Sequence, residues 1–506
     1  MSGVALLDEM LVPGGGHAFR PLGDDFVARS AAGEVDVQTL DAFIAAPSDE
    51  ALALWCGPAL AASDAGRLRR DLDRSISAID AAISDQVNAL IAHPRYAALE
   101  AAWRGVRWLV GELGSDGLAR IRLLNARWEE IARDFERASE IETSALFEQI
   151  YAYEFDMPGG VPFSLLLGLY DVQHRPSREH RTDDVEVMRS LAQVAAAAFA
   201  PFVLDAAPGM FGVDRFGDLD LRQTLAADFR SPAYGRFHAL QARTDTRFLG
   251  VAAPPVRLRG AWRGRSVGDC GFRYEADERR PLWGAAALAI GHVALRSFND
   301  YRWPAAIRGL VRDERTGGIV DTLSPVDFGT DAPGAIVKFP IQVQLSEALD
   351  REMAEAGFIT LRRIKDTPYL AIHNTPSLHR PRTTYDTAIA QANQQLGTML
   401  NYILCVSRFA HYIKVIGREW VGSFQSAEEC ELRLQRWLNR FVSGGDDLSF
   451  EQKARYPLQE GRISVRDLPG KPGSYECTVA LKPHFQVDQA VSEFQLVTIV
   501  EEARAA

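Results

Sequence analysis

Residues 407–424 read SRFAHYIKVIGREWVGSF, and their spacing predicts a helix with two faces of opposite character. At 3.6 residues per turn, one side of this helix collects the apolar side chains Phe409, Ile413, Ile416 and Trp420. The opposite side carries the basic residues Arg408, His411, Lys414 and Arg418, which we call the contact stripe. We expect the apolar side to pack into a domain and the contact stripe to face water, an acidic partner or a polyanion.

The sequence after this helix predicts a small module of helices and strands. RISVRD (462–467), YECTVAL (475–481) and FQLVTIV (494–500) have the composition of strands, and PGKPG (469–473) predicts a hairpin between the first two. A small sheet leaves its edge strands exposed, and such edges accept strands from another chain. We therefore expect residues 381–506 to form a C-terminal α+β domain whose sheet a partner can extend.

Helical and strand patterns alternate through the middle of the chain. The helix predicted at 96–110 turns Trp103 and Trp108 inward. Further predicted elements are, in order, buried strands at 120–126 and 163–172, a helix followed by a strand within 183–203, and a helix at 283–298. This alternation is typical of an α/β fold. We assign residues 61–380 to an α/β core.

A long helix with a regular apolar seam precedes these elements. The seam residues recur every three or four positions and are Leu68, Leu72, Ile76, Ile79, Ile83, Val87 and Leu90. This spacing is that of a coiled coil over about three heptads, and the His93-Pro94 step ends the helix. Packing against a helix of the same chain and packing against a helix of another subunit both satisfy the pattern.

Residues 1–60 form a distinct N-terminal arm and linker. Two short segments, LLDEMLV (6–12) and VDVQTLDAFIAAP (35–47), are separated by a stretch rich in glycine and proline. Neither segment is long enough to fold alone. We interpret them as peptides that await a partner surface.

Composition narrows the class of protein. The chain has 506 residues, a hydrophobic content of 47% and a net charge of −11, so we expect two or three domains and no general nucleic-acid binding, which needs a basic footprint. The five cysteines form no CxxC pair, which favours reduced thiols. The sequence contains no signal peptide and no run long enough to span a bilayer. We expect a cytoplasmic protein without stable membrane insertion.

Motifs for catalysis are missing from the sequence. It contains no P-loop, HExxH, GxSxG or GxGxxG pattern, and no acidic residue close in sequence orients His411 as a catalytic base. We expect no catalytic residue, metal site or cofactor, and interpret the chain as a structural protein rather than an enzyme. A cytosolic enzyme with a dispersed active site is the alternative.

Several sequence blocks resemble one family, in that family's order. HPRYAALEAAWRGVRWLV (93–110) is similar to the signature H-P-x-[FY]-x-x-L-E-x-x-W-R-G-L, with its central residues at Leu99, Glu100, Trp103, Arg104 and Gly105. The blocks that follow lie at 129–138, 144–168, 200–213, 282–289, 407–424 and 469–485. Together they resemble the large sheath subunit of the type VI secretion system, the TssC/VipB/EvpB family, over roughly residues 60–500.

This resemblance implies a sheath-protein fold and a mechanical function. The large subunit pairs with a small sheath subunit (TssB/VipA-like), and the protomers stack as a helical tube around an inner Hcp tube on a baseplate in the bacterial cytoplasm. The sheath contracts to propel the inner tube. Neighbouring protomers exchange strands, for which the N-terminal arm and the C-terminal sheet are suited. The contact stripe would then face a neighbouring protomer or the inner tube.

The family also implies an ATPase recognition site near the N-terminus. The AAA+ ATPase ClpV disassembles the contracted sheath, and the segment Leu6, Leu7, Asp8, Glu9, Met10 and Leu11 resembles the peptide that it binds. A frayed terminus is the alternative interpretation of this segment.

Some blocks depart from the family pattern. FHALQARTDTRFLGV (237–251) keeps Asp245, Arg247, Phe248 and Gly250 but lacks the usual tryptophan and first arginine. A divergent or second-copy subunit that acts as an assembly or baseplate-proximal factor is therefore an alternative to the main sheath subunit.

Overall fold

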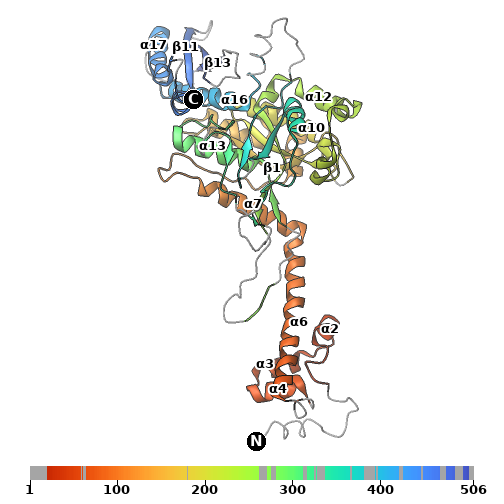
Figure 1. Cartoon of the computed structure of the whole chain (residues 1–506). Coiled ribbons are helices and arrows are strands. Elements are labelled where there is room, and N and C mark those ends of the chain that lie inside the picture. Colours follow the sequence, from red (N-terminus) through yellow and green to blue (C-terminus); the bar gives the residue numbers. More distant parts are fainter. Residues whose placement is uncertain are drawn as a thin grey trace. The chain divides into compact units, whose positions relative to one another are not determined.

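Figure 1 presents the computed structural model of the chain. The structure describes residues 20–57, 60, 64–178, 180–260, 271–274, 281–310, 316–323, 326–327, 337–364, 367–380, 394, 397–420, 426–445, 448–467, 475–484 and 494–500. The chain divides into two compact units. The first comprises Met1–Ala97 and Gly260–Pro281, and the second comprises Ala98–Arg259 and Leu282–Ala506.

The first unit is helical in its described part. Its helices are α2 (Phe26–Ala31), α3 (Val37–Ala45), α4 (Ser48–Cys56) and α6 (Ala65–Ala92). The ring of Trp55 lies 5.2 Å from that of Phe26 and 5.3 Å from that of Phe43, so that one tryptophan holds the short helices together. Residues 20–57 thus form a small helical cluster, and contain no strand that could serve as the predicted inter-protomer arm.

Helix α6 confirms the prediction of a long helix that ends at His93. Its first turn is capped by Asp64, whose carboxylate accepts a hydrogen bond from the backbone N–H of Arg67 at 2.5 Å. His93 has an extended backbone, as expected for the residue before a proline, and Pro94 begins the next helix, α7 (Pro94–Gly111).

A six-stranded sheet forms the centre of the second unit. Its strand order is β1-β2-β3-β9-β10-β6. The parallel strands are β1 (Leu166–Val172), β2 (Phe202–Ala206), β3 (Leu249–Ala253) and β9 (Phe358–Arg363). The antiparallel strands β10 (Leu370–Ile372) and β6 (Ile319–Val320) complete one edge. The predicted α/β class is confirmed, as are the strand within 163–172 and the helix-strand pair within 183–203.

Successive residues of the central strands point to opposite faces, and both faces are covered. Phe202 and Leu204 belong to a core that includes helix α10 (Asp184–Ala197), whereas Val203 belongs to a second core that includes α13 (Ala287–Tyr301). Burial on both faces explains the continuous apolar runs of these strands. Figure 1 labels α10 and α13 beside β1.

Shorter elements surround this sheet in the second unit. The helices are α8 (Trp128–Arg137), α9 (Ala145–Phe147), the π-helix η2 (Glu148–Asp156), α11 (Ala226–Phe229), α12 (Gly235–Gln241) and α14 (Glu347–Glu355). The 3-10 turns are η1 (Ile141–Thr143), η3 (Pro208–Phe211), η4 (Phe216–Leu221), η5 (Pro232–Tyr234) and η6 (Thr244–Phe248). Two strand pairs are β4 (Val256–Arg259) with β5 (Leu282–Gly284), and β7 (Val326–Asp327) with β8 (Val337–Lys338).

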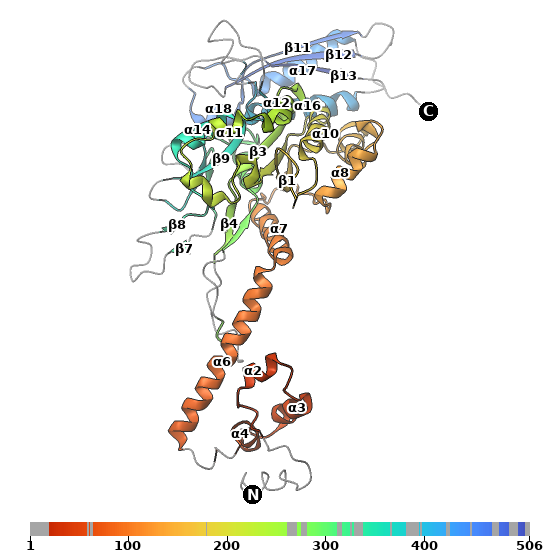
Figure 2. The same ribbon diagram turned by 90° about the vertical axis from the view of Figure 1, so that its right-hand side faces the viewer.

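The C-terminal elements form a three-stranded antiparallel sheet with helices on it. The strands are β11 (Leu458–Asp467), β12 (Tyr475–Pro483) and β13 (Phe494–Val500), which confirms the three predicted strands. Its helices are α16 (Leu400–Glu419), α17 (Ala427–Leu438), η8 (Asn439–Phe441) and α18 (Phe450–Arg455). Figure 2 shows the three strands side by side with α17. Strand residues Val465 and Cys477 face each other and pack on α17.

Two local predictions are wrong. Residues 120–126 form no strand, because no described neighbour pairs with their backbone. The side chains of Leu123 and Leu124 are 60% and 63% exposed. Trp103 does not point inward but is 60% exposed. Gly105 sets the rotation of α7, since a Cβ there would lie 2.5 Å from Leu288 Cδ1. Trp103 is two residues away, on roughly the opposite side of the helix.

Candidate functional site

The apolar seam on α6 has little cover within the described part of the chain. Ile76, Ile83 and Leu90 are 54%, 40% and 67% exposed, while Leu68, Leu72, Ile79 and Val87 are half-buried. Ser84 is the single buried residue of this helix. A helix of 28 residues is about 42 Å long. The seam is therefore an extended apolar surface suited to a partner helix.

Helix α7 carries a second apolar surface, which we call the α7 stripe: Leu99, Trp103 and Val110. These three side chains are 57%, 60% and 49% exposed. At about 100° per residue they fall within roughly 40° of one another. Gly105 and Leu109, which lie on a different side of the helix, are buried in the core. A helix apolar on two sides needs two partners, and the described chain supplies one.

The signature residue Glu100 fixes α7 to strand β4. Its two carboxylate oxygens accept hydrogen bonds from Arg259 at 2.7 and 2.9 Å, and Arg104 donates a further one at 2.7 Å. Burial would raise the pKa of Glu100, but the two guanidinium groups outweigh it and hold this pKa below its usual range. The signature Leu-Glu-x-x-Trp-Arg-Gly thus contains residues that anchor α7 (Glu100, Arg104 and Gly105) and exposed apolar residues (Leu99 and Trp103).

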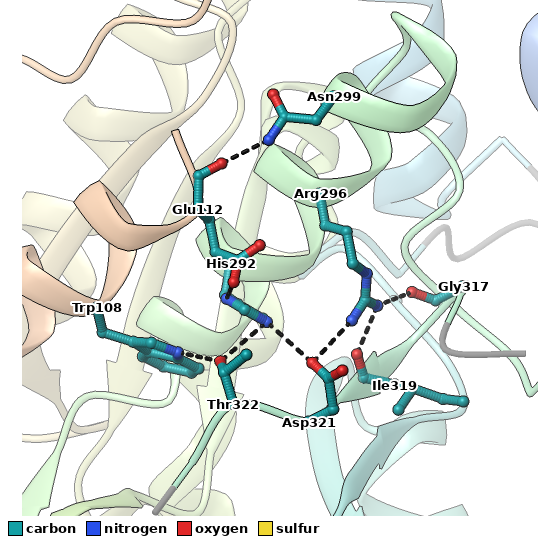
Figure 3. Close-up of polar contacts among 9 residues, drawn as sticks. All are labelled: Trp108, Glu112, His292, Arg296, Asn299, Gly317, Ile319, Asp321 and Thr322. Atoms are coloured by element: carbon teal, nitrogen blue, oxygen red, sulfur yellow. Dashed lines mark hydrogen bonds and ion pairs between the residues drawn. The ribbon is translucent and has the colours of Figure 1, made fainter. Parts of the chain in front are cut away.

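A buried polar cluster joins α7 to α13 (Figure 3). His292 on α13 is fully buried and stacks on Trp108 of α7, with the ring centroids 4.7 Å apart. The Trp108 indole N–H donates to Thr322 Oγ1 at 2.5 Å. The imidazole lies between two carboxylates, with Nδ1 3.6 Å from Glu112 Oε1 and Nε2 3.7 Å from Asp321 Oδ1.

Arg296 extends this cluster toward strand β6. Its guanidinium lies 3.3 Å from Asp321 Oδ1 and donates to the carbonyl oxygens of Gly317 and Ile319 at 3.0 and 2.5 Å. The contact with the His292 imidazole and the charge of Arg296 outweigh burial and lower the pKa of Asp321. Because His292 is inaccessible to solvent, we interpret the cluster as a structural joint between α7, α13 and the residues after β6.

The contact-stripe prediction is wrong for His411. This residue is 1% exposed, and its Nε2–H donates to the carbonyl oxygen of Ala198 at 3.0 Å. Burial lowers the pKa of His411 to about 3, so the ring is neutral and carries no positive charge to a partner. Helical spacing placed it opposite the apolar face, but α16 is packed on both sides.

The other stripe residues make contacts within the chain. Lys414 Nζ lies 2.9 Å from Asp156 Oδ1. Arg418 donates to the carbonyl oxygens of Phe155, Met157 and Gly160 at 3.0, 2.6 and 3.3 Å, at the C-terminal end of the π-helix η2. A positive group there complements the partial negative charge of the helix end. These two side chains clamp η2 onto α16.

Arg408 lies over the ring of Tyr412 on the same helix, with its guanidinium carbon 4.6 Å from the ring centroid. Its Nη2 also donates to the Tyr412 hydroxyl at 3.2 Å.

The proposed ATPase recognition segment, Leu6 to Leu11, lies outside the described residues.

Sequence reasoning missed the α7 stripe and the His292 cluster. Leu99, Trp103, Val106 and Val110 recur at intervals of four, three and four, so the stripe had a detectable signal. The His292 cluster had none, because Trp108, His292 and Asp321 are far apart in sequence and lie together only in the folded chain.

Comparisons with known proteins identify the family. The EvpB/VC_A0108, tail sheath N-terminal domain family matches residues 73–379, and the EvpB/VC_A0108, tail sheath gpW/gp25-like domain family matches residues 389–500. The type VI secretion system sheath protein TssC1 of Pseudomonas aeruginosa is 31% identical over 445 residues, which cover 86% of this chain and 87% of that protein.

One solved structure, titled cryo-EM structure of the anti-feeding prophage (AFP) baseplate, 6-fold symmetrised, contains a chain that matches at 11% identity. The match covers 70% of this chain and 74% of that one, with a TM-score of 0.33. A likeness this weak supports no inference about function.

These matches define a contractile tail sheath protein. The chain belongs to the TssC/VipB/EvpB family of type VI secretion sheath proteins and corresponds to the large sheath subunit. The resemblance seen in the sequence is thereby confirmed. Among the helices in the described ranges, none is both long and apolar enough to cross a membrane.

Proposed function

We propose that this large subunit pairs with a small sheath subunit and polymerises as a helical tube around an Hcp inner tube. The tube rests on a baseplate in the bacterial cytoplasm and contracts to propel the inner tube, a mechanical rather than catalytic function. The observation that carries this proposal is the pair of exposed apolar helical surfaces, the α6 seam and the α7 stripe. Monomeric proteins rarely expose such surfaces unless a partner covers them.

The magnitude of the exposed area supports an obligate partner. Fully burying a leucine, isoleucine or valine side chain contributes about 1.5–3 kcal/mol. The large residues exposed by 40% or more on these surfaces are Ile76, Ile83, Leu90, Leu99, Trp103 and Val110. Covering them supplies several kcal/mol, which is enough to offset much of the entropy lost on association.

The edges of the C-terminal sheet support strand exchange between protomers. β11 and β13 are its outer strands, and an added strand from a neighbour would pair with the free backbone groups of an edge. Such a link joins protomers through backbone hydrogen bonds while the connecting chain flexes, which suits an assembly with two packings of the same subunits.

Co-expression with the cognate small subunit tests the pairing. We expect Trp103→Glu to reduce co-purification of the small subunit at least tenfold, because the charge would be buried in an apolar interface. Leu221→Glu is the matched control, since Leu221 is 85% exposed and outside both surfaces. Equal recovery of the partner with Trp103→Glu and wild type would refute the role of the α7 stripe.

Electron microscopy of the same preparations separates two functions. Long tubules support the main sheath subunit. A soluble heterodimer that never forms tubules supports the accessory, baseplate-proximal function suggested by the changed block at 237–251.

ClpV recognition by Leu6, Leu7, Asp8, Glu9, Met10 and Leu11 is a separate proposal. It is tested by binding of a peptide of residues 1–14 to the N-domain of the ATPase. We expect Leu7→Asp to weaken binding at least tenfold, since an apolar contact is replaced by a charge. If the altered peptide binds as tightly as the native one, the segment is not the recognition site.

A further inference from the structure

Residues 120–127, RIRLLNAR, lie between α7 and α8 in the second unit and run without a helix, turn or bend. The backbone N–H groups of 120–126 donate no hydrogen bond to a described residue, and the carbonyl oxygens of 120–125 accept none from one. Seven consecutive N–H groups without a protein partner have the character of an open sheet edge, which is a template for an added strand. We call residues 120–127 the open segment.

Side chains, rather than backbone hydrogen bonds, hold the open segment in place. Arg122 forms an ion pair with Glu154 of η2. Near the other end, the carbonyl oxygen of Ala126 accepts a hydrogen bond from the hydroxyl of Tyr170, on β1, at 2.6 Å. A partner therefore meets a preformed extended chain and loses little conformational entropy in ordering it.

The exposed side chains on and around the open segment are apolar. Leu123 and Leu124 are both exposed, and successive residues of an extended chain point to opposite sides, so apolar surface lies on both sides of the segment. Tyr153, next to Glu154 in η2, is 44% exposed. Val161, whose N–H donates to Glu154 at 3.0 Å, is 52% exposed. Apolar residues on both sides are typical of a strand that is covered on both faces.

We infer that the open segment pairs with a β-strand of the small sheath subunit. The added strand would bind one row of the unpaired N–H and carbonyl groups, and the rest of the partner would cover Leu123 and Leu124. This inference rests on the proposed pairing of the two subunits. It adds the place on the large subunit where a strand of the partner is bound.

Charge argues against a second copy of the open segment as its partner. The segment contains Arg120, Arg122 and Arg127 and no carboxylate. Antiparallel pairing of the segment with itself about its centre would place Arg120 opposite Arg127, and parallel pairing in register would place each arginine opposite its own copy. Like charges directly opposite each other destabilise a sheet. A strand of different sequence, with carboxylates opposite the arginines, avoids this repulsion.

Hydrogen exchange read by mass spectrometry, on the full chain alone and in complex with the small subunit, tests the inference. In the free chain we expect the amides of 120–126 to exchange nearly as fast as those of an unstructured peptide. In the complex, alternate amides should exchange about 100-fold more slowly, because one partner strand binds every second N–H group. Residues 115–117, which are exposed and whose N–H groups also lack a backbone partner among the described residues, are the control. They should exchange fast in both samples.

The outcomes separate this inference from the proposed function. If no complex forms, the pairing of the subunits and the strand inference both fail. If the complex forms and 120–126 exchange as in the free chain, the strand inference alone is wrong. Protection that is already present in the large subunit alone would assign the partner strand to a second copy and would also overturn it.

Proline substitution tests the role of the backbone directly. Leu123→Pro/Leu124→Pro removes two successive N–H groups, one of which points to the partner whichever edge is bound. It breaks no backbone hydrogen bond of the free chain among the described residues. Leu123→Ala/Leu124→Ala is the matched control, which loses the same side chains and keeps both N–H groups.

We expect the proline variant to reduce co-purification of the small subunit at least tenfold, and the alanine variant to reduce it less. Circular dichroism verifies that each variant is folded. Recovery of the small subunit by the proline variant that equals that of wild type or of the alanine variant would overturn the inference.

Discussion

At the scale of single residues, His411 shows how burial overrides the chemistry that a side chain has in water. Its Nε2–H donates to the Ala198 carbonyl oxygen, and its Nδ1 has no hydrogen-bond partner among the described residues. A charged ring would have to give up hydration without a counter-ion, which is costly. The folded protein therefore keeps this imidazole neutral.

The pH dependence of stability follows from this lowered pKa. In the unfolded chain His411 titrates near 6.5, and in the folded chain near 3, so its contribution is fully present above pH 6.5 and is lost as pH falls toward 3. Between pH 7.5 and pH 5 we expect a loss of about 2 kcal/mol from this residue. His411→Gln keeps a donor for Ala198 and removes this part of the pH dependence.

Thermal unfolding at pH 7.5 and pH 5 measures the effect. The difference in melting temperature between wild type and His411→Gln should shift in favour of the variant at the lower pH. His238→Gln, at an exposed histidine of α12, is the control. An equal loss of stability in wild type and His411→Gln on acidification would contradict the assignment.

At the scale of elements, the π-helix η2 depends on the side chain of Arg418. Replacing it with alanine removes three hydrogen bonds to carbonyl oxygens near the end of η2. We expect Arg418→Ala to destabilise the protein by about 2 kcal/mol and to increase amide hydrogen exchange in residues 148–160. Arg436→Ala on α17 should change neither quantity. Unaltered exchange in residues 148–160 would show that Arg418 does not hold η2.

For the seam of α6 we expect a loss of partner binding without a loss of stability, unlike the effect of Arg418→Ala. Ile83 is 40% exposed, so Ile83→Asp should change the free energy of unfolding by less than about 1 kcal/mol but weaken small-subunit binding at least tenfold. Ala81→Asp places the same charge on the other side of the helix and should bind normally. Equal binding by both variants, measured by co-purification, would assign the interface elsewhere.

The elements differ in how far the sequence predicts them. Helix α6, the β11–β12 hairpin and the helix-strand pair that became α10 and β2 have strong local patterns, because their secondary structure follows from their own periodicity. Residues 120–126 have a similar apolar composition, yet they form no strand. A strand needs a pairing partner, and no local pattern reports whether one is present.

The candidate site was predictable where it depends on one helix. Helical spacing identified the α6 seam, and the same reasoning applied to Leu99 and Trp103 would have found the α7 stripe. The sequence analysis misplaced Trp103, because the rotation of α7 is set by the contact of Gly105 with Leu288. Leu288 lies far away in sequence. Helical spacing also misjudged Lys414, whose counter-charge Asp156 comes from a distant segment.

At the scale of the whole molecule, exposed apolar surface is divided between different parts of the chain. The α6 seam belongs to the first unit, and the α7 stripe belongs to the second. A subunit of a helical polymer needs several unlike contacts of this kind, since heterologous interfaces that do not close on themselves generate filaments.

Helix α16 belongs to two cores at once. Leu400 and Leu404 near its start pack in the core of the central sheet, whereas Phe409 and Ile413 farther along pack in the core of the C-terminal sheet. A helix of 20 residues is about 30 Å long. A force that separates the C-terminal sheet from the central sheet would therefore have to break side-chain contacts in both cores that hold α16. Resistance to force is then shared along the helix, so that this subunit can transmit a load between its two sheets without unfolding.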